Sequence, residues 1–545
     1  MKPRTYRLIL ASLTGLMLGL AFPPVPTGVT ATLAFVPFFI LFESIDRYAT
    51  GFRYSYLVFF IFNLVTLYWA GGFAFCKDIY QMIAGTLLLL AHPFFFCVPI
   101  IAWIFIRRQL GFKFSIFIFP FIWTAFEFLH SLSEISFPWL TLGNTQTYDR
   151  AIIQFASYTG VYGISFWLLW LNVLGFILYA KLFLNEWKPI SRKSVLLIGG
   201  ILILYLLPKI YGNYVINSYS ASYGREVHVA VIQPNIDPFE KWSGSPDEPL
   251  ALIQQQTDVV AKKSVDVVIW PETAPPFYIL HPGNQFYLNQ IKRQVDTLNI
   301  NLLTGIPDIY YYTGTDVIPH SSKVSISGEH YDTYNSSILL RPGNAKIQKY
   351  SKIILVPFAE RVPFSESLSF LNAMQWNFGL GGWAHGKDTT VFSFSTTGGE
   401  EIKFSNMICY ESIYPDLVAS FVRRGAQFLT VVTNDSWWGN TSGAYQHKQF
   451  ATLRAVENHR WIVQCANGGL SCFIDPVGNI VQQTKMYEQI TLFCKIEPRE
   501  QITFYTRNGD WVAALAIIST AFFLTAAIGK KFYHYIRKKG LYAIY

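Results

Sequence analysis

Three polar residues that lie far apart in the sequence each stand at the end of a predicted strand: Glu272 in VVIWPE, Lys352 in QKYSK and Cys409 in SNMICYE. Strand ends hold side chains rigidly, while the adjoining loops leave them accessible. A carboxylate, an amine and a thiol form a workable set for acyl transfer. Glu272 would take the thiol proton as a general base and return it to a leaving group. Lys352 would lower the thiol pKa and stabilise the oxyanion, and Cys409 would carry the acyl group as a thioester.

Each of these residues also has a purely structural interpretation. A cysteine at the end of an apolar strand is most often packed in a core, because free cysteine is among the most buried residue types. A lysine in YSK is usually a solvated surface group, and a glutamate after Trp-Pro is often a turn or cap residue. The combination of all three at strand ends favours a catalytic site.

The composition indicates a membrane protein. Of the 545 residues, 52% are hydrophobic, 17% are aromatic and only 14% are charged, which is too apolar for a soluble enzyme of this length. Eight apolar segments are predicted to cross a bilayer as helices. They comprise residues 8–22, 30–42, 56–75, 82–106, 114–129, 152–183, 195–211 and 511–528.

The distribution of lysine and arginine predicts the orientation. Basic residues concentrate in the segments that share a side with the N-terminus, which places both termini in the cytoplasm. Residues 1–212 would hold seven spans, residues 213–505 an extracytoplasmic domain, and residues 506–545 the eighth span and a cytoplasmic tail. The net charge of +9 then reflects topology and contact with anionic lipid, and no nucleic-acid partner is expected.

Within residues 213–505, short β-rich runs alternate with amphipathic segments, and a hairpin over 336–352 is predicted to turn at Pro342-Gly343-Asn344. The strands are predicted at 227–235, 265–272, 299–309, 401–411, 427–435 and 460–469. The helices are predicted at 250–262, 286–297, 414–424 and 447–459. This pattern is typical of a layered α/β sandwich with helices outside two sheets.

The segments VVIWPETAPPF, YSKIILVPFAERVPF and MICYESIYPD resemble, in order and spacing, the Glu-Lys-Cys stations of the nitrilase superfamily. With the apolar N-terminal block, FPWLTLGNTQ at 137–146 and KIILVPFAE, nearly the whole chain resembles the apolipoprotein N-acyltransferase family. The resemblance implies a nitrilase-like αββα sandwich on the periplasmic side of a bacterial inner membrane. It also implies an acyl donor, a phospholipid such as phosphatidylethanolamine, and an acceptor, the α-amino group of an apolipoprotein's diacylglyceryl-cysteine.

The resemblance assigns roles to further residues. Glu272, Lys352 and Cys409 match the family's base, lysine and nucleophile. The other matches are Glu360, which supports the lysine, Tyr410 and Glu411, which follow the nucleophile, and Trp242, an aromatic residue near the site entrance. Structural alternatives stay open, since Trp242 could cover a hydrophobic edge, Tyr410 could be core, and Glu360 could pair with Arg361 on the surface.

Several features depart from the family pattern or stay open. Arg361 follows Glu360 where an aromatic residue is commoner, and could contact a phosphate head group; Trp437-Trp438 leaves the shape of the site mouth open. Residues 370–386, rich in glycine and tryptophan, either dip into the lipid surface or pack on their own domain. Glu127 is either functional or reaches the membrane interface.

No metal or other cofactor is expected, because the ten histidines are scattered and the chemistry needs no ion. The oxidising outer compartment would permit a disulfide among Cys465, Cys472 and Cys494, whereas Cys409 must stay free. Two rival functions stay open at this point. One is a membrane-tethered amidase or nitrilase that hydrolyses a C–N bond; the other is a catalytically inert membrane scaffold.

Overall fold

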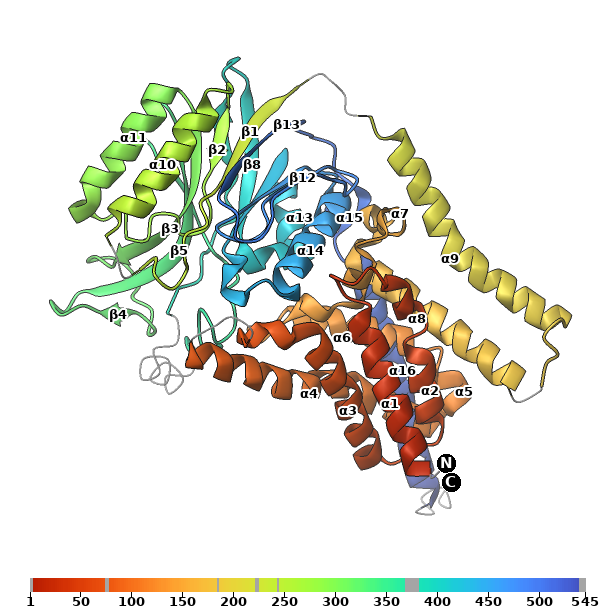
Figure 1. The fold of residues 1–545 in the computed structure, drawn as a ribbon. Coiled ribbons are helices and arrows are strands. Elements are labelled where there is room, and N and C mark those ends of the chain that lie inside the picture. Colours follow the sequence, from red (N-terminus) through yellow and green to blue (C-terminus); the bar gives the residue numbers. More distant parts are fainter. Residues whose placement is uncertain are drawn as a thin grey trace.

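The computed structural model describes residues 3–73, 78–183, 186–220, 225–242, 245–367 and 382–538. It has two parts (Figure 1): a bundle of apolar helices built from the N-terminal segments and the last helix, and a layered α/β domain seated at one end of the bundle. Because the N- and C-terminal helices share the bundle, the α/β domain is inserted between the helix Arg192–Ser218 and the last helix, Trp511–Lys538.

The helices of the bundle follow the predicted apolar segments but vary in length. They are α1 (Pro3–Leu20), α2 (Phe35–Glu43), α3 (Tyr48–Leu67), α4 (Ile79–Leu110), α5 (Phe112–Ser115), α6 (Phe119–Ser131), α7 (Arg150–Ile153), α8 (Ala156–Phe183), α9 (Arg192–Ser218) and α16 (Trp511–Lys538). In the described part of the chain, five helical segments are long and apolar enough to cross a membrane: Tyr48–Gly71, Ile79–Leu110, Ala156–Phe183, Arg192–Ser218 and Trp511–Lys538.

The other predicted spans are shorter as helices. α2 has 9 residues and α6 has 13, which correspond to about 14 and about 20 Å of helix, less than the ~30 Å hydrocarbon layer. α1 has 18 residues and carries Arg4 and Arg7 in its first turns. The structure therefore shows several apolar helices, and the count of eight spans stays a prediction.

The short helices are nevertheless buried, because aromatic side chains surround them. Phe35 of α2 packs against Phe119 and Trp123 of α6, with ring centroids 5.4 and 5.0 Å apart. α9 behaves differently: it lies at the edge of the bundle (Figure 1) and packs on α7 and α8, where Trp167 Nε1 donates to the Leu204 carbonyl oxygen at 2.8 Å, and only 6% of its apolar window is buried. Its apolar sides are consequently left for lipid.

The α/β domain contains two sheets. The first runs β13-β1-β2-β3-β5-β4, with β6 paired to β5, and the second runs β12-β11-β10-β9-β8-β7. The strands of the first sheet are β1 (Val227–Gln233), β2 (Val267–Ile269), β3 (Asn301–Tyr311), β4 (Lys323–Val324), β5 (His330–Leu340), β6 (Gln348–Ser351) and β13 (Ile490–Ile496). Those of the second are β7 (Phe392–Ser395), β8 (Glu401–Ile408), β9 (Phe428–Thr433), β10 (Ile462–Ala466), β11 (Cys472–Ile474) and β12 (Ile480–Gln483).

Helices cover the outer faces of both sheets. α10 (Asp247–Ala261) and α11 (Gln285–Leu298) pack on the first sheet, and α13 (Pro415–Arg423) and α14 (Ser442–Asn458) pack on the second (Figure 1). The α11 side chains Leu288, Ile291 and Val295, spaced three and four residues apart, form one buried stripe. Apolar residues of both sheets, such as Ile269 and Ile408, meet in the core between them. The predicted αββα layering is confirmed.

The α/β domain docks on the bundle through the first turns of α14. Gln446 accepts hydrogen bonds from the indole Nε1 of Trp69 at 3.0 Å and of Trp139 at 2.7 Å. Its amide nitrogen donates to the carbonyl oxygen of Pro23 at 2.8 Å. One buried side chain thus joins three segments of the membrane part to the α/β domain. The short helix α15 (Phe504–Asn508) then leads into α16.

Candidate active site

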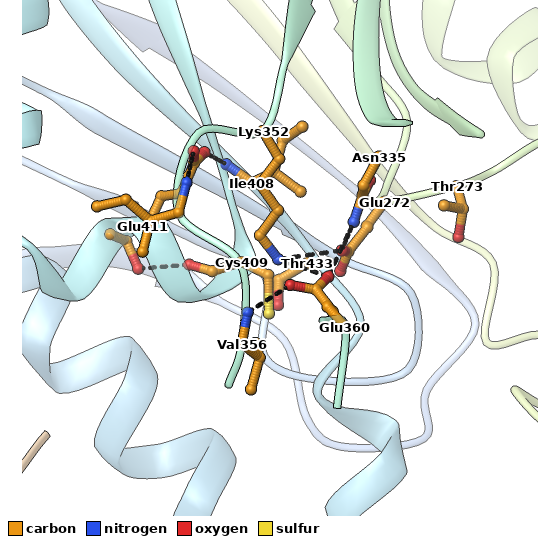
Figure 2. A network of polar contacts seen from close by, with 12 residues as sticks. Glu272, Thr273, Asn335, Lys352, Val356, Glu360, Ile408, Cys409, Glu411 and Thr433 are labelled. Carbon is orange, nitrogen blue, oxygen red and sulfur yellow. Dashed lines mark hydrogen bonds and ion pairs between the residues drawn. The ribbon is translucent and has the colours of Figure 1, made fainter. Parts of the chain in front are cut away.

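The structure brings Glu272, Lys352 and Cys409 together between the two sheets (Figure 2). Glu272 follows β2, Lys352 comes directly after β6, and Cys409 follows β8 as the first residue of the 3₁₀ helix η6 (Cys409–Ile413). Nζ of Lys352 lies 4.0 Å from Oε1 of Glu272, and Lys352 and Cys409 interact electrostatically. The predicted convergence of three distant strand ends is present in the fold.

Two carboxylates hold the lysine. Nζ of Lys352 donates to Oε1 of Glu360 at 2.8 Å, and the second oxygen of Glu360 accepts from the Val356 backbone N–H at 2.7 Å. The amide nitrogen of Asn335 on β5 donates to Oε1 of Glu272 at 2.7 Å and reaches Oε1 of Glu360 at 3.3 Å. The surface pairing of Glu360 with Arg361 is therefore wrong: Glu360 pairs with Lys352.

Asn335 did not emerge from the sequence, because the predicted hairpin strand began one residue later, at position 336. The strand observed, β5, begins at His330. Asn335 could have been found from the sequence as a polar residue in a strand next to the candidate lysine.

Burial and charge set the protonation states of the cluster. Burial alone would lower the pKa of Lys352, but Glu360 and then Glu272 outweigh it and raise that pKa. Burial raises the pKa of Glu272, and Glu360 adds to this effect while Lys352 opposes it. Lys352 is therefore held as an ammonium ion between two acidic groups.

Lys352 acts on the pKa of Cys409 in the expected direction, but other effects outweigh it. Burial raises the pKa of Cys409 well above its usual range and Glu272 raises it further; Lys352 acts in the lowering direction but offsets this only in part. Burial therefore favours the protonated thiol. A neighbouring base is needed to remove its proton, and Glu272 is the group placed to do so.

Glu411 ties the segment after Lys352 to the segment of the nucleophile. Its Oε1 accepts from the Tyr350 hydroxyl at 2.6 Å and from the backbone N–H groups of Ile353 and Ile354 at 2.6 and 3.2 Å. Its Oε2 accepts from the Ile408 backbone N–H at 2.8 Å. This fully buried carboxylate thus connects β6 and β8 at the point where both leave their sheets.

The backbone is left-handed at the nucleophile and directly after Glu272. Cys409 has φ 52° and Thr273, next to Glu272, has φ 47°. Non-glycine residues adopt this conformation uncommonly, and it persists only where the surrounding structure imposes it. Such residues cluster at functional sites.

Comparison with known proteins agrees with this geometry. The family model described as the apolipoprotein N-acyltransferase N-terminal domain matches residues 14–174, and the carbon-nitrogen hydrolase model matches residues 228–500. The apolipoprotein N-acyltransferase of Chlorobaculum tepidum is 36% identical over 530 residues, which cover 95% of this chain and 96% of that protein. The chain belongs to the apolipoprotein N-acyltransferase family.

The comparisons also found a second relative and a solved structure. The apolipoprotein N-acyltransferase of Geobacter metallireducens is 30% identical over 538 residues, covering 97% of this chain and 96% of that one. A solved structure from Saccharomyces cerevisiae, a member of branch 10 of the nitrilase superfamily, is 19% identical; it covers 51% of this chain and 93% of its own, with a TM-score of 0.36. The resemblance to the apolipoprotein N-acyltransferase family predicted from the sequence is confirmed.

A second buried lysine, which the sequence did not single out, contacts Glu272 and its neighbour. Nζ of Lys241 donates to the Glu272 carbonyl oxygen and to the Thr273 hydroxyl, each at 3.1 Å. Burial lowers the pKa of Lys241 to about 8, against the opposing effect of Glu272. Its neighbour Trp242 is 49% exposed, which agrees with either an entrance position or a covered hydrophobic edge.

Tyr410 connects the site to the membrane part, and Glu127 lies within that part. The Tyr410 hydroxyl donates to the Ser136 carbonyl oxygen at 3.0 Å, and its ring stacks on Phe137 with centroids 6.1 Å apart. Glu127 accepts from Trp123 Nε1 at 2.9 Å and from a backbone N–H in 137–146. Glu127 is buried within the protein.

Arg361 is also buried. It donates to the Trp383 carbonyl oxygen at 2.9 Å and lies 3.0 Å from a Glu366 carboxylate oxygen. The predicted contact with a head group stays a prediction. Most of the predicted lipid-facing loop lies outside the described residues; its described end packs on the α/β domain, where Ala384 donates to Thr333. Among the described cysteines, the thiols that could have formed a disulfide are free: Cys465, Cys472 and Cys494.

Proposed function

We propose that the protein transfers an acyl chain from a membrane phospholipid, through a thioester on Cys409, to the α-amino group of the N-terminal diacylglyceryl-cysteine of an apolipoprotein. The observation that carries this proposal is the buried cluster of Glu272, Lys352 and Cys409 in an α/β domain docked on apolar helices. The names of the two relatives described above support it. Lipoprotein maturation would be the process served.

In the first half-reaction, Glu272 removes the thiol proton of Cys409 and the sulfur attacks an ester carbonyl carbon of the phospholipid. The Lys352 ammonium group, kept charged by Glu360 at 2.8 Å, stabilises the oxyanion that develops. The ester C–O bond then breaks, and the lysophospholipid leaves with the proton that Glu272 returns. The acyl group stays on Cys409 as a thioester.

In the second half-reaction, the α-amino group of the acceptor attacks the thioester carbonyl carbon. Glu272 takes a proton from the attacking nitrogen, and the C–S bond breaks as the amide forms. The same proton then restores the Cys409 thiol. No electron transfer is involved, and proton movement by one carboxylate is enough for both steps.

The other predicted residues support Glu272, Lys352 and Cys409. Glu360 keeps Lys352 charged, and Glu411 fixes the segments that carry Lys352 and Cys409. Tyr410 joins the nucleophile segment to the membrane part, and Trp242 stands at the entrance to the site. None of these roles requires a cofactor.

The membrane part explains how the substrates reach the thiol. Exposing an acyl chain to water costs about 0.8 kcal/mol per CH₂, so both lipid substrates should react without leaving the bilayer. We place the protein in a bacterial inner membrane with eight spans, cytoplasmic termini and a periplasmic domain of residues 213–505. Phosphatidylethanolamine is the proposed donor, and no nucleic acid takes part.

The proposal is tested on the full-length protein in detergent or lipid nanodiscs with a phospholipid labelled in its acyl chains. Cys409 should acquire a hydroxylamine-sensitive label, which a diacylated lipopeptide then removes as an N-acylated product detected by mass. Cys409→Ser should abolish labelling, whereas Cys494→Ser, which changes a thiol on β13, should not. Full turnover by Cys409→Ser contradicts the mechanism. Loss of the label to water, with no N-acylated product, would indicate a hydrolase instead.

A further inference from the structure

A second polar network lies behind Cys409 and takes no part in the steps above. Asp435 opens the 3₁₀ helix η7 (Asp435–Trp438), and His447 lies in the first turns of α14; both side chains are 0% exposed. Nδ1 of His447 lies 3.0 and 3.1 Å from the two carboxylate oxygens of Asp435. The Thr433 hydroxyl donates to the same carboxylate at 2.8 Å.

The other ring nitrogen of His447 faces the backbone of the nucleophile. Nε2 lies 3.1 Å from the Cys409 carbonyl oxygen and 2.7 Å from the Ser412 hydroxyl oxygen. The Ser412 hydroxyl itself donates to the Cys409 carbonyl at 2.9 Å. A carbonyl oxygen only accepts, and the Ser412 hydrogen is already directed to it, so Nε2 satisfies both contacts only as a donor.

Nδ1 must also donate, because a carboxylate only accepts. The geometry therefore requires protons on both nitrogens, so that His447 is an imidazolium ion paired with Asp435. Burial acts to lower the pKa of His447, but Asp435 outweighs it, and Glu272 at the end of β2 acts in the same direction. Trp139 of the membrane part covers the ring, with centroids 5.8 Å apart.

We propose that Asp435 and His447 are positioning residues for the nucleophile. The imidazolium ion and the Ser412 hydroxyl together hold the Cys409 carbonyl oxygen, and so keep Cys409 in its left-handed conformation. In Figure 2, Cys409 lies beside Lys352 and Glu360. This role rests on the proposed function, since it positions the nucleophile of that reaction.

The planarity of the peptide bond extends the effect. In a trans peptide the N–H of the next residue points opposite to the C=O. Fixing the Cys409 carbonyl on the His447 side therefore fixes the Tyr410 N–H on the other side. The network sets the orientation of the whole peptide plane that follows the reactive sulfur.

Ser412, His447 and Asp435 also have the spacing of a Ser-His-Asp hydrolase triad. Two observations argue against a second nucleophile. The Ser412 side chain is buried at 1% exposure, and its hydroxyl hydrogen is directed to the Cys409 carbonyl. The network therefore serves Cys409 rather than a substrate.

Replacement of His447 separates its two contributions. Glutamine places an amide donor near the position of Nε2 but carries no charge, whereas leucine supplies neither. In His447→Gln the Asp435 carboxylate loses its counter-charge and should disfavour the nearby thiolate. Adding Asp435→Asn removes that unpaired charge, so the double variant should reverse this effect.

The experiment measures the alkylation of Cys409 by iodoacetamide against pH, by peptide mass, in the full-length protein in detergent. We expect the midpoint to rise by about one pH unit in His447→Gln and to return toward the parent in the double variant. Thioester formation from the labelled phospholipid should fall by about 100-fold in His447→Leu. His447→Gln should form the thioester at least about tenfold faster than His447→Leu, with the half-saturating donor concentration unchanged. His330→Gln, at the distal end of β5, is the matched control.

The proposal is overturned if His447→Gln alkylates with the parental midpoint, or if it forms thioester no faster than His447→Leu while both are folded. A double variant that fails to reverse the shift would also overturn it. If His447→Leu does not fold, the alkylation series with His447→Gln still decides. If the parent forms no thioester, the proposed function fails, while the alkylation series still reports on the positioning of Cys409.

Discussion

Glu411→Gln is the substitution that most directly tests how the site is assembled. The parent carboxylate is surrounded by four donors: the Tyr350 hydroxyl and the backbone N–H groups of Ile353 and Ile354 on Oε1, and the Ile408 N–H on Oε2. Glutamine has nearly the same shape. If its oxygen keeps the three contacts at Oε1, its NH₂ group must face the Ile408 N–H, donor against donor.

The magnitude follows from the number of contacts. A hydrogen bond to a charged group contributes about 1.5–3 kcal/mol, and a buried unsatisfied donor costs about 1–3 kcal/mol. Loss of one such bond, with weakening of the other three, should cost about 3 kcal/mol in the free energy of unfolding. For a domain of this size that corresponds to a Tm lower by about 5 °C.

Activity should fall as well, because the same bonds fix residues 353 and 354 directly after Lys352. If the aligned segment becomes less stable by about 3 kcal/mol, the population of the aligned site falls roughly 100-fold. Thioester formation from a labelled phospholipid should therefore slow by about that factor, as measured by rapid quench. Glu329→Gln, at an exposed turn before β5, is the control and should change neither quantity. Thioester formation within threefold of the parent, with an unchanged Tm, would refute this account of Glu411.

Three further predictions use single substitutions. Burial lowers the pKa of Lys241 to about 8. Between pH 8 and about 10.4, Lys241 therefore binds fewer protons in the folded protein than in the unfolded chain. The parent should therefore gain stability over that range, by about 3 kcal/mol, and thermal unfolding against pH should show this gain lost in Lys241→Met. In Glu360→Gln the pKa of Lys352 should fall, because burial lowers it and the negative charge of Glu360 that raises it is gone. The alkaline limb of the kcat/KM profile should therefore move to lower pH. Tyr410→Phe removes the hydrogen bond to Ser136. The free energy of unfolding should fall by about 1 kcal/mol and the Tm by a few degrees, while the rate of thioester formation should stay within threefold of the parent.

The strand ends were predictable because short-range pattern determines them. Glu272, Lys352 and Cys409 follow runs whose apolar side chains become the core between the sheets, so the sequence marks both the strand and the residue after it. The start of β5 was not predictable in this way. Its first half carries polar residues such as Asn335, and it is held by antiparallel pairing with β3 from Leu302↔Leu340 to Tyr311↔Tyr331. Strand extension by pairing is a long-range effect, so Asn335 was missed.

The lengths of the membrane helices were also only partly predictable. A hydropathy window counts apolar residues but not backbone conformation. The segment 114–129 is divided because α6 starts at Phe119 with Pro120 in its first turn, where proline favours a helix start and cannot continue an earlier one. The segment 30–42 begins in the 3₁₀ turn Gly28–Thr32, so α2 occupies only its second part.

The protonation of the thiol and the network behind it depend on the folded structure. Sequence reasoning placed a lysine beside Cys409, which lowers a thiol pKa in isolation. Burial dominates in the fold and reverses the result. His447 and Asp435 are 38 and 26 positions from Cys409 and lie in an apparently ordinary helix and turn. Their relation to the nucleophile appears only when η6, η7 and α14 are packed together.

The position of α14 gives a physical reason for joining this α/β domain to its own helices. Gln446 is bonded to Trp69, Trp139 and Pro23 of the membrane part, and the next residue, His447, is bonded to the carbonyl oxygen of Cys409. Consecutive residues of one buried helix thus contact the bundle and the nucleophile. Since packed interiors transmit small displacements, a shift of the bundle against the domain would reach Cys409 through a single turn. The membrane part therefore contributes to the geometry of the thiol as well as holding the domain beside the lipid.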